Sequence, residues 1–263
     1  MVLNKIKYIL NKFKKKSLKD KEDEKKIRPI VKNKEKYELK TIYPNIILPE
    51  GIIYKENPET GRVSSEPPNI VTLNQTVACF IKNAKKIVNV SAGIGTFEWF
   101  VSVDSSLNLI ASESDKECVA WCKKNRLRKN ITYCNKKMNE LKKEYGTFDL
   151  ALAVNFIEHI YDYGSFLNEF SNLANNAIIT TVNKDRDFSS SKTSPPANRQ
   201  CVREWNAGEF YWVLKVFYTK VNLYSMQDQY IPQAKKVGLY STLTPLIAIC
   251  ENNISQIKLN GKN

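Results

Sequence analysis

Two glycines and one glutamate have the spacing of a site that binds a nucleoside-containing ligand. Gly93 and Gly95 follow an apolar run and begin a helical pattern, so a ligand can approach the backbone where no Cβ intervenes. An isolated glycine pair would be better explained by a tight strand-to-helix turn that binds nothing. Glu113 favours the ligand site, because it ends the following strand pattern and can accept two hydrogen bonds from a ribose diol. Ser114 and Asp115 then begin the next helix as caps.

A second polar segment follows the apolar strand pattern at 148–155. It contains Glu158 and His159, and His159 is the only histidine of the chain. A single histidine is more often structural than catalytic, but this one follows a strand end, where α/β folds bind their ligands. The position favours a functional role for His159, with Glu158 as the next candidate for a base.

Strand and helix patterns alternate from residue 70 to residue 250. Strand patterns occur at 86–91, 107–112, 131–134, 148–155, 177–182, 220–225 and 246–250. Helical spacing occurs at 70–84, 95–102, 116–125, 163–174 and 208–216. Alternation at these lengths predicts a parallel sheet with helices on both faces. The pattern assigns no element to residues 226–243.

The charge of the chain is unevenly distributed. Residues 1–40 hold fourteen Lys and one Arg against six acids, whereas the formal net charge of the whole chain is +14. The six cysteines form no C-x-x-C pair and no cluster with histidine, which indicates free thiols in a cytoplasmic protein rather than a zinc or disulfide framework. No secretory signal and no apolar run of membrane-spanning length is found, so we expect a cytoplasmic location.

Four regions follow from these patterns. Residues 1–17 form a basic amphipathic helix, and 18–68 form a linker and irregular segment. Residues 69–251 form the main domain, and 252–263 form a polar tail. The first helix either lies at an anionic membrane surface, which would place the protein peripherally at the inner face of a membrane, or is solvated or packed on protein.

Five segments together resemble one enzyme family. They are VNVSAGIGTF (88–97), ASESD (111–115), FDLALAVNFIEHI (148–160), AIITTVN (177–183) and CVREWNAGEFYWVLK (201–215). In this order and spacing they resemble the class I S-adenosylmethionine-dependent methyltransferases, in the group that contains small-molecule O-methyltransferases of quinone and polysaccharide pathways. The resemblance implies an α/β, Rossmann-like fold with a seven-stranded, mostly parallel sheet, the last strand antiparallel, and helices on both faces. It also implies methyl transfer from S-adenosylmethionine to a nucleophile.

The resemblance also implies roles for individual residues. Gly93 and Gly95 would approach the methionine part of the cofactor, Glu113 would hold its ribose, and Asn155 would lie along its methionyl side. The full set of expected cofactor contacts is Asn89, Ser91, Gly93, Gly95, Glu113, Ser114, Asn155 and Phe156.

On the acceptor side, His159 and Glu158 are the expected catalytic residues, with the imidazole as the base for a hydroxyl acceptor. Arg203 and Trp205 are candidates for contact with the acceptor. Related quinone enzymes carry an E-x-x-E-H arrangement that can hold a divalent metal, but Asn155 stands at its first position here, so we predict no metal.

Four positions depart from the pattern of the family. Asn89 stands where Asp or Glu is usual, and Ser91 replaces the first glycine. Lys137 stands near the place of an adenine-contacting Asp, and Cys201 replaces a His. These departures bear on cofactor affinity.

The leading hypothesis is O-methylation of a sugar or other small acceptor in a surface-glycan pathway. A degenerate methyltransferase domain that serves as a binding or scaffold subunit is the second hypothesis, motivated by the four departures. Methylation of nucleic acid is the third. It is disfavoured because the charge excess lies in residues 1–40 and no RNA-binding module is recognisable. A nicotinamide-dependent dehydrogenase is disfavoured because Glu98 replaces the third glycine of its fingerprint.

Overall fold

The computed structural model describes residues 68–253, apart from 82, 187–195, 197–200 and 227–231. The predictions for 1–17 and for 18–67 lie outside the described residues, as does the tail from residue 254. Two residues of the predicted tail, 252 and 253, belong instead to the strand that ends the described chain.

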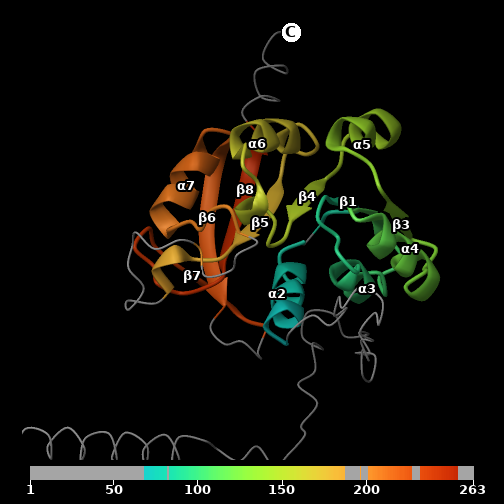
Figure 1. The fold of residues 1–263 in the computed structure, drawn as a ribbon, viewed down its shortest axis with the longest axis horizontal. Coiled ribbons are helices and arrows are strands. Elements are labelled where there is room, and N and C mark those ends of the chain that lie inside the picture. The colour runs from blue at the N-terminus through green and yellow to red at the C-terminus, as the bar shows by residue number, and fades with distance from the viewer. Residues whose placement is uncertain (1–67, 82, 187–195, 197–200, 227–231, 254–263) are drawn as a thin grey trace, which may run out of the picture. The chain divides into compact units, whose positions relative to one another are not determined.

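An eight-stranded mixed sheet forms the centre of the described domain, in the order β3-β2-β1-β4-β5-β8-β6-β7 (Figure 1). Its strands are β1 (Lys86–Asn89), β2 (Asn108–Ser112), β3 (Ile131–Cys134), β4 (Leu150–Ala153), β5 (Ala177–Thr181), β6 (Tyr218–Met226), β7 (Ala234–Lys236) and β8 (Leu246–Asn253). Strands β1 to β5 pair in parallel, whereas β8 runs antiparallel to both β5 and β6. The predicted fold class is confirmed.

The sheet has eight strands, one more than the seven predicted. Strand β7 lies in the section that the sequence pattern left unassigned, and it pairs antiparallel with β6 at the edge of the sheet. Strand β7 is only three residues long, and two of them are exposed. It is therefore too short to show a recognisable alternation of apolar and polar residues.

Helices cover the two faces of the sheet as two separate groups. A continuous apolar cluster joins one face of the sheet to α5 (Met138–Tyr145), α6 (Tyr163–Ser171) and α7 (Ala207–Lys215). The remaining helices are α2 (Pro68–Ala78), α3 (Thr96–Val101) and α4 (Lys116–Asn125), and they contribute no residue to that cluster. Because both faces are covered, the central strands β4 and β5 are buried along their whole length.

Local sequence explains where the helices begin. Asp115 accepts hydrogen bonds from the first turn of α4, and Asn206 forms a capping box with Glu209 at the start of α7. Helix α5 was not predicted, because Leu141 is its one buried residue and gives no apolar periodicity. No helix among the described residues is long and apolar enough to cross a membrane.

Candidate functional site

The turn after β1 contains two glycines that are required for different reasons. Gly93 and Gly95 have φ angles of 52° and 70°, in the left-handed region that disfavours other residues. A Cβ on Gly95 would lie 2.7 Å from Cε1 of Tyr133, so the tyrosine excludes any side chain there. A Cβ on Gly93 would meet nothing within 4 Å. Gly93 therefore borders open space in which a ligand can reach the backbone.

Asn89 and Ser91 hold this turn against the sheet. The Asn89 amide is buried, and its Nδ2 donates to Oε1 of Glu98 at 2.8 Å. Its Oδ1 accepts from the backbone N–H of Ser91 at 3.2 Å. The Ser91 hydroxyl accepts from the N–H of Val154 at 3.0 Å, which joins the turn to the end of β4. Asn89 and Ser91, the two residues that depart from the family pattern here, thus both form hydrogen bonds within the protein.

Glu113 lies directly across the turn from Gly93. Its Oε2 accepts from the Gly93 N–H at 2.9 Å, and its Oε1 accepts from the Ser114 hydroxyl and the Asp115 N–H, each at 3.0 Å. A carboxylate has about four acceptor sites, so these three bonds leave one of them for a ligand. The structure brings Gly93, Glu113 and Ser114 together, as the sequence pattern predicts.

Lys137 has a local role in this structure. It is exposed, precedes α5, and its backbone N–H donates to Oε2 of Glu140 at 2.7 Å. No described contact joins it to Glu113 or to the glycine turn.

Asn155 follows β4 in a strained conformation. Its φ angle is 48°, and its backbone N–H donates to the Thr180 hydroxyl at 2.8 Å. The same hydroxyl donates to Oδ1 of Asn155 at 3.1 Å, so the amide is fixed at the carboxyl end of β4. The neighbouring Phe156 packs its ring edge-on against Phe166, with 5.5 Å between centroids. Phe156 thus contributes to the hydrophobic core, and its expected contact with the cofactor stays a prediction.

A buried polar group behind the glycine turn was not predicted. The Glu98 side chain is 1% exposed, and Arg126, which is 3% exposed, donates to the Thr96 hydroxyl at 2.9 Å. Burial, and then the charge of Glu98, raise the pKa of Cys122 to about 12 and raise the pKa of Tyr133 above its usual range. Glu98 and Arg126 are therefore close to Tyr133, the residue whose ring lies beside Gly95.

Glu158 and His159 lie in η2 (Ile157–His159), the short helix after β4. The Glu158 side chain is 1% exposed, and burial raises the pKa of its carboxyl. The charge of His159 and the nearby Thr181 hydroxyl oppose this shift in the pKa, whereas the charge of Glu204 adds to it. His159 is half-buried, so it is the more accessible of the two predicted catalytic residues.

The segment after residue 200 binds the backbone of η2. The carbonyl of Glu158 accepts from the N–H groups of Val202 and Arg203, at 2.8 Å and 3.1 Å. Cys201 is buried beside these groups, and burial followed by the charges of Glu158 and Glu204 raises the pKa of its thiol. A histidine at this position could carry a proton between the two carboxylates, which a cysteine with a raised pKa does not offer.

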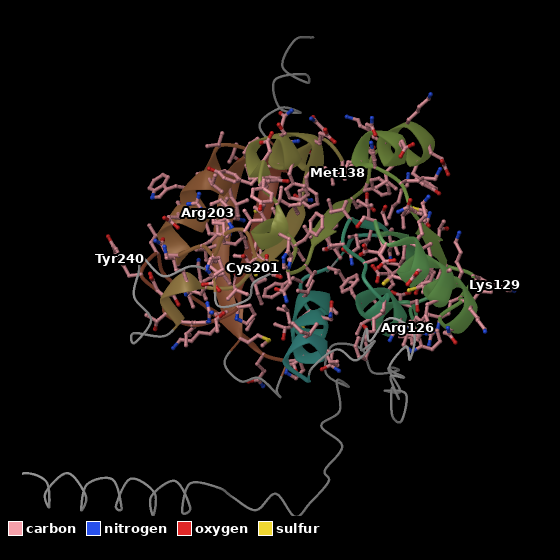
Figure 2. The ribbon with its side chains drawn as sticks, in the orientation of Figure 1. Arg126, Lys129, Met138, Cys201, Arg203 and Tyr240 are labelled. Carbon is pink, nitrogen blue, oxygen red and sulfur yellow. The ribbon has the colours of Figure 1, made fainter. Side chains whose placement is uncertain are left out.

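A cavity of about 410 Å³ lies next to η2. Its walls include Ile160 and Val202, and its polar lining comes from Tyr161, Tyr163, Lys184, Arg203, Glu204 and Glu209. Arg203, labelled in Figure 2, was predicted to contact the acceptor and does line this cavity. These other lining residues were not predicted. Apart from Val202 and Glu204, the neighbours of Arg203, they lie before and on α6, on η3 (Lys184–Arg186) and on α7, far apart in the sequence.

Trp205 lies behind the cavity wall rather than on it. It is 1% exposed, and the guanidinium carbon of Arg203 lies 4.1 Å from the centroid of its ring. The Tyr163 ring meets Trp205 edge-on, with 4.9 Å between centroids. Trp205 therefore supports two cavity residues, and its direct contact with an acceptor stays a prediction.

Metal ligands do not gather in the described part of the chain. Among these residues no group of three or more His, Cys, Asp or Glu side chains could hold a metal ion. The expectation that the protein uses no metal stays a prediction.

Comparison with known proteins identifies the fold. No protein-family model and no curated protein sequence matches the chain. Among solved structures, the methyltransferase domain of bacterial CtHen1 aligns with 70% of this chain and 99% of its own, at 19% identity and a TM-score of 0.53. A SAM-dependent methyltransferase of Thermotoga maritima covers 69% of this chain and 88% of its own, at 15% identity and a TM-score of 0.51.

A third structure has a ligand bound. The plantazolicin methyltransferase BpumL, in complex with a triazolic desmethylPZN analog and SAH, covers 72% of this chain and 86% of its own. Its identity is 12% and its TM-score 0.51. At these identities the likeness concerns the fold. The described domain has the fold of the class I S-adenosylmethionine-dependent methyltransferases.

Proposed function

We propose that this protein is an S-adenosylmethionine-dependent methyltransferase that methylates a hydroxyl group of a sugar or another small acceptor, such as one used in a surface-glycan pathway. The observation that carries the proposal is the position of Glu113 across the turn from Gly93, whose missing side chain leaves open space. The SAH bound in the BpumL structure supports the choice of cofactor.

The residues present fit such a cofactor. The open side of Gly93 can admit its amino-acid part, and Glu113 has an acceptor site left for a ribose hydroxyl. Asn155 lies at the carboxyl end of β4, next to β1 in the sheet. When bound, S-adenosylmethionine supplies a methyl group already attached to a good leaving group. The protein then mainly has to align the acceptor and remove its proton.

His159 is the proposed base. It would take the proton of the acceptor hydroxyl while that oxygen forms its bond to the methyl group. The charge of Glu158 interacts with His159, and burial raises the pKa of Glu158, so its surroundings disfavour an isolated negative charge. A protonated imidazole would offset that charge, so Glu158 would stabilise His159 after proton transfer.

Isothermal titration calorimetry with S-adenosylmethionine tests the proposal. We expect saturable binding by the full chain and at least tenfold weaker binding by Glu113→Ala, because a hydrogen bond to a charged group contributes about 1.5–3 kcal/mol. Glu117→Ala, in the first turn of α4 and exposed, is the matched control and should bind normally. If no binding were found at millimolar concentrations of S-adenosylmethionine, the proposed methyltransferase activity would be excluded.

A binding or scaffold subunit is the second candidate function. It is favoured by the internal bonds of Asn89, Ser91 and Glu113, which use most of the polar groups that face the glycine turn. This function predicts that Glu113→Ala leaves the methylation of surface glycans in cells unchanged. Mass spectrometry of those glycans, from strains with and without the variant, distinguishes the two functions.

A further inference from the structure

Two cations, Lys184 and Arg203, and two carboxylates, Glu204 and Glu209, line the cavity beside η2. Arg186, which pairs with Glu204 from outside the lining, brings the cations to one more than the carboxylates. We propose that the cavity binds an acceptor whose ring carries a carboxylate or phosphate, with the acid group on Lys184. This inference rests on the proposed function, because it names the class of acceptor for the same site.

Each carboxylate of the cavity already has a guanidinium partner. Glu204 Oε1 lies 3.0 Å from Nη2 of Arg186, and Glu209 Oε2 lies 3.5 Å from Nη2 of Arg203. Lys184 is fixed through its backbone, whose N–H donates to the Trp205 carbonyl at 2.8 Å. Between residues 68 and 253, within the ranges described above, no acid forms an ion pair with its ammonium group. A ligand with an acid group would neutralise this half-buried charge.

The aromatic residues of the cavity indicate a ring. Tyr161 is 86% exposed at the cavity, although a large aromatic side chain gains free energy when it is covered. Arg203 is stacked against Trp205, so its guanidinium is held in one orientation. The planar groups of Tyr161, Tyr163 and Arg203 thus provide surfaces against which a sugar or aromatic ring can pack.

The size and position of the cavity suit the distal part of a small acceptor. Its volume of about 410 Å³ falls in the range of pockets that bind small molecules. One of its lining residues is Ile160, which directly follows His159 in the chain. An acid group held by Lys184 would therefore anchor the acceptor away from the reacting hydroxyl, and this remote binding energy can be used to align it.

Calorimetry with three matched probes tests the inference on the full-length protein. The probes are glucuronate, glucose 6-phosphate and glucose, each titrated at low ionic strength. The variants are Lys184→Gln and, as a control with the same change of charge, Lys124→Gln in the last turn of α4. We expect wild type and Lys124→Gln to bind at least one acidic probe about tenfold more tightly than glucose, and Lys184→Gln to lose that preference.

The outcomes separate this inference from the proposed function. Equal affinity of Lys184→Gln and wild type for both acids would overturn the inference, as would a wild type that does not prefer either acid. Titration with S-adenosylmethionine is run in parallel. Cofactor binding without acid preference leaves the methyltransferase proposal intact, whereas acid preference without cofactor binding leaves only an anion site. Whichever of the two acidic probes binds more tightly shows whether the site prefers a carboxylate or a phosphate.

A second variant tests the ring surface independently. Tyr161→Ala should weaken the binding of all three probes by a similar factor, because it removes packing area but no charge. Tyr240, which is 96% exposed on the segment before β8, provides the control Tyr240→Ala. A Tyr161→Ala variant that binds as tightly as wild type would overturn the stacking part of the inference.

Discussion

The glycine turn, on the proposed cofactor side, and η2, on the proposed acceptor side, differ in how completely their polar side chains are hydrogen-bonded. At the turn, Asn89, Ser91 and Glu113 each form a hydrogen bond to another part of the protein. Behind the turn, Arg126 Nη2 and the Tyr133 hydroxyl are buried without a well-formed partner among the described residues. On the acceptor side, Glu158 Oε2 and the Trp205 indole nitrogen are buried without a well-formed partner among the described residues. Buried polar atoms without partners are rare in folded proteins. The polar side chains at the glycine turn are therefore fixed by the protein itself, whereas the carboxyl of Glu158 in η2 has one oxygen that only ordered water or a change of conformation can satisfy.

The largest effect should come from placing the acid usual in the family on the cofactor side. Asn89→Asp would replace a donor with a carboxylate against the buried carboxylate of Glu98, whose oxygen lies 2.8 Å from Nδ2 of Asn89. We expect the free energy of unfolding to fall by on the order of 3–5 kcal/mol at neutral pH, as when a buried charge loses its partner. Urea unfolding measures the change.

The control for this substitution is Asn139→Asp, which makes the same chemical change on the exposed first turn of α5. Its effect should stay within about 0.5 kcal/mol. If Asn89→Asp were as stable as wild type, the internal bonds would not be what fixes the cofactor side, and the contrast between the two sides would fail.

The next largest effect separates the two glycines. Gly95→Ala would combine a left-handed backbone with a Cβ that lies 2.7 Å from the Tyr133 ring, so we expect a loss of about 2–4 kcal/mol. Gly93→Ala adds a methyl group in open space and should cost only about 1 kcal/mol. Thermal and urea unfolding compare the pair. Equal losses would show that Tyr133 yields to the new methyl group.

The smallest effect concerns the acceptor side and depends on pH. The pKa of Glu158 is raised in the folded protein, so its contribution to stability is greatest below the unfolded pKa and decreases as pH rises through the folded pKa. Glu158→Gln does not titrate. Relative to wild type, its free energy of unfolding should therefore increase from pH 4 to pH 8, by about 1.4 kcal/mol for each unit of the shift.

Urea unfolding at several pH values measures this difference. Glu117→Gln, on the exposed first turn of α4, serves as the reference for a carboxylate in water. Parallel profiles of Glu158→Gln and wild type would mean that the Glu158 carboxyl is solvated. The side chains of η2 would then be as well satisfied as those of the glycine turn.

The same two sides differ in how far the sequence predicts them. The glycine turn and Glu113 lie close together in the chain, so their motif predicts both the fold, which the structure confirms, and the proposed cofactor side. The acceptor cavity is built from the segment after η2, from η3, from residues 202–204 and from α7, and only the folded chain brings Lys184 and Tyr161 together. One signal in the sequence, Glu98, was used only as an argument against a dehydrogenase. Glu98 is the single charged residue of the apolar stretch 87–103, which indicates a buried carboxylate with a polar partner.

The position of β8 has a consequence for synthesis of the protein. Strand β8 lies between β5 and β6, so that Ala177 pairs with Cys250. Strands β1 to β5 can pair as soon as they leave the ribosome, but β6 and β7 have no place in the sheet until residues 246–253 are made. We therefore expect the cofactor side to be formed on a nascent chain whose acceptor side is still open, and arrest of translation before Leu246 should leave α7 accessible to protease.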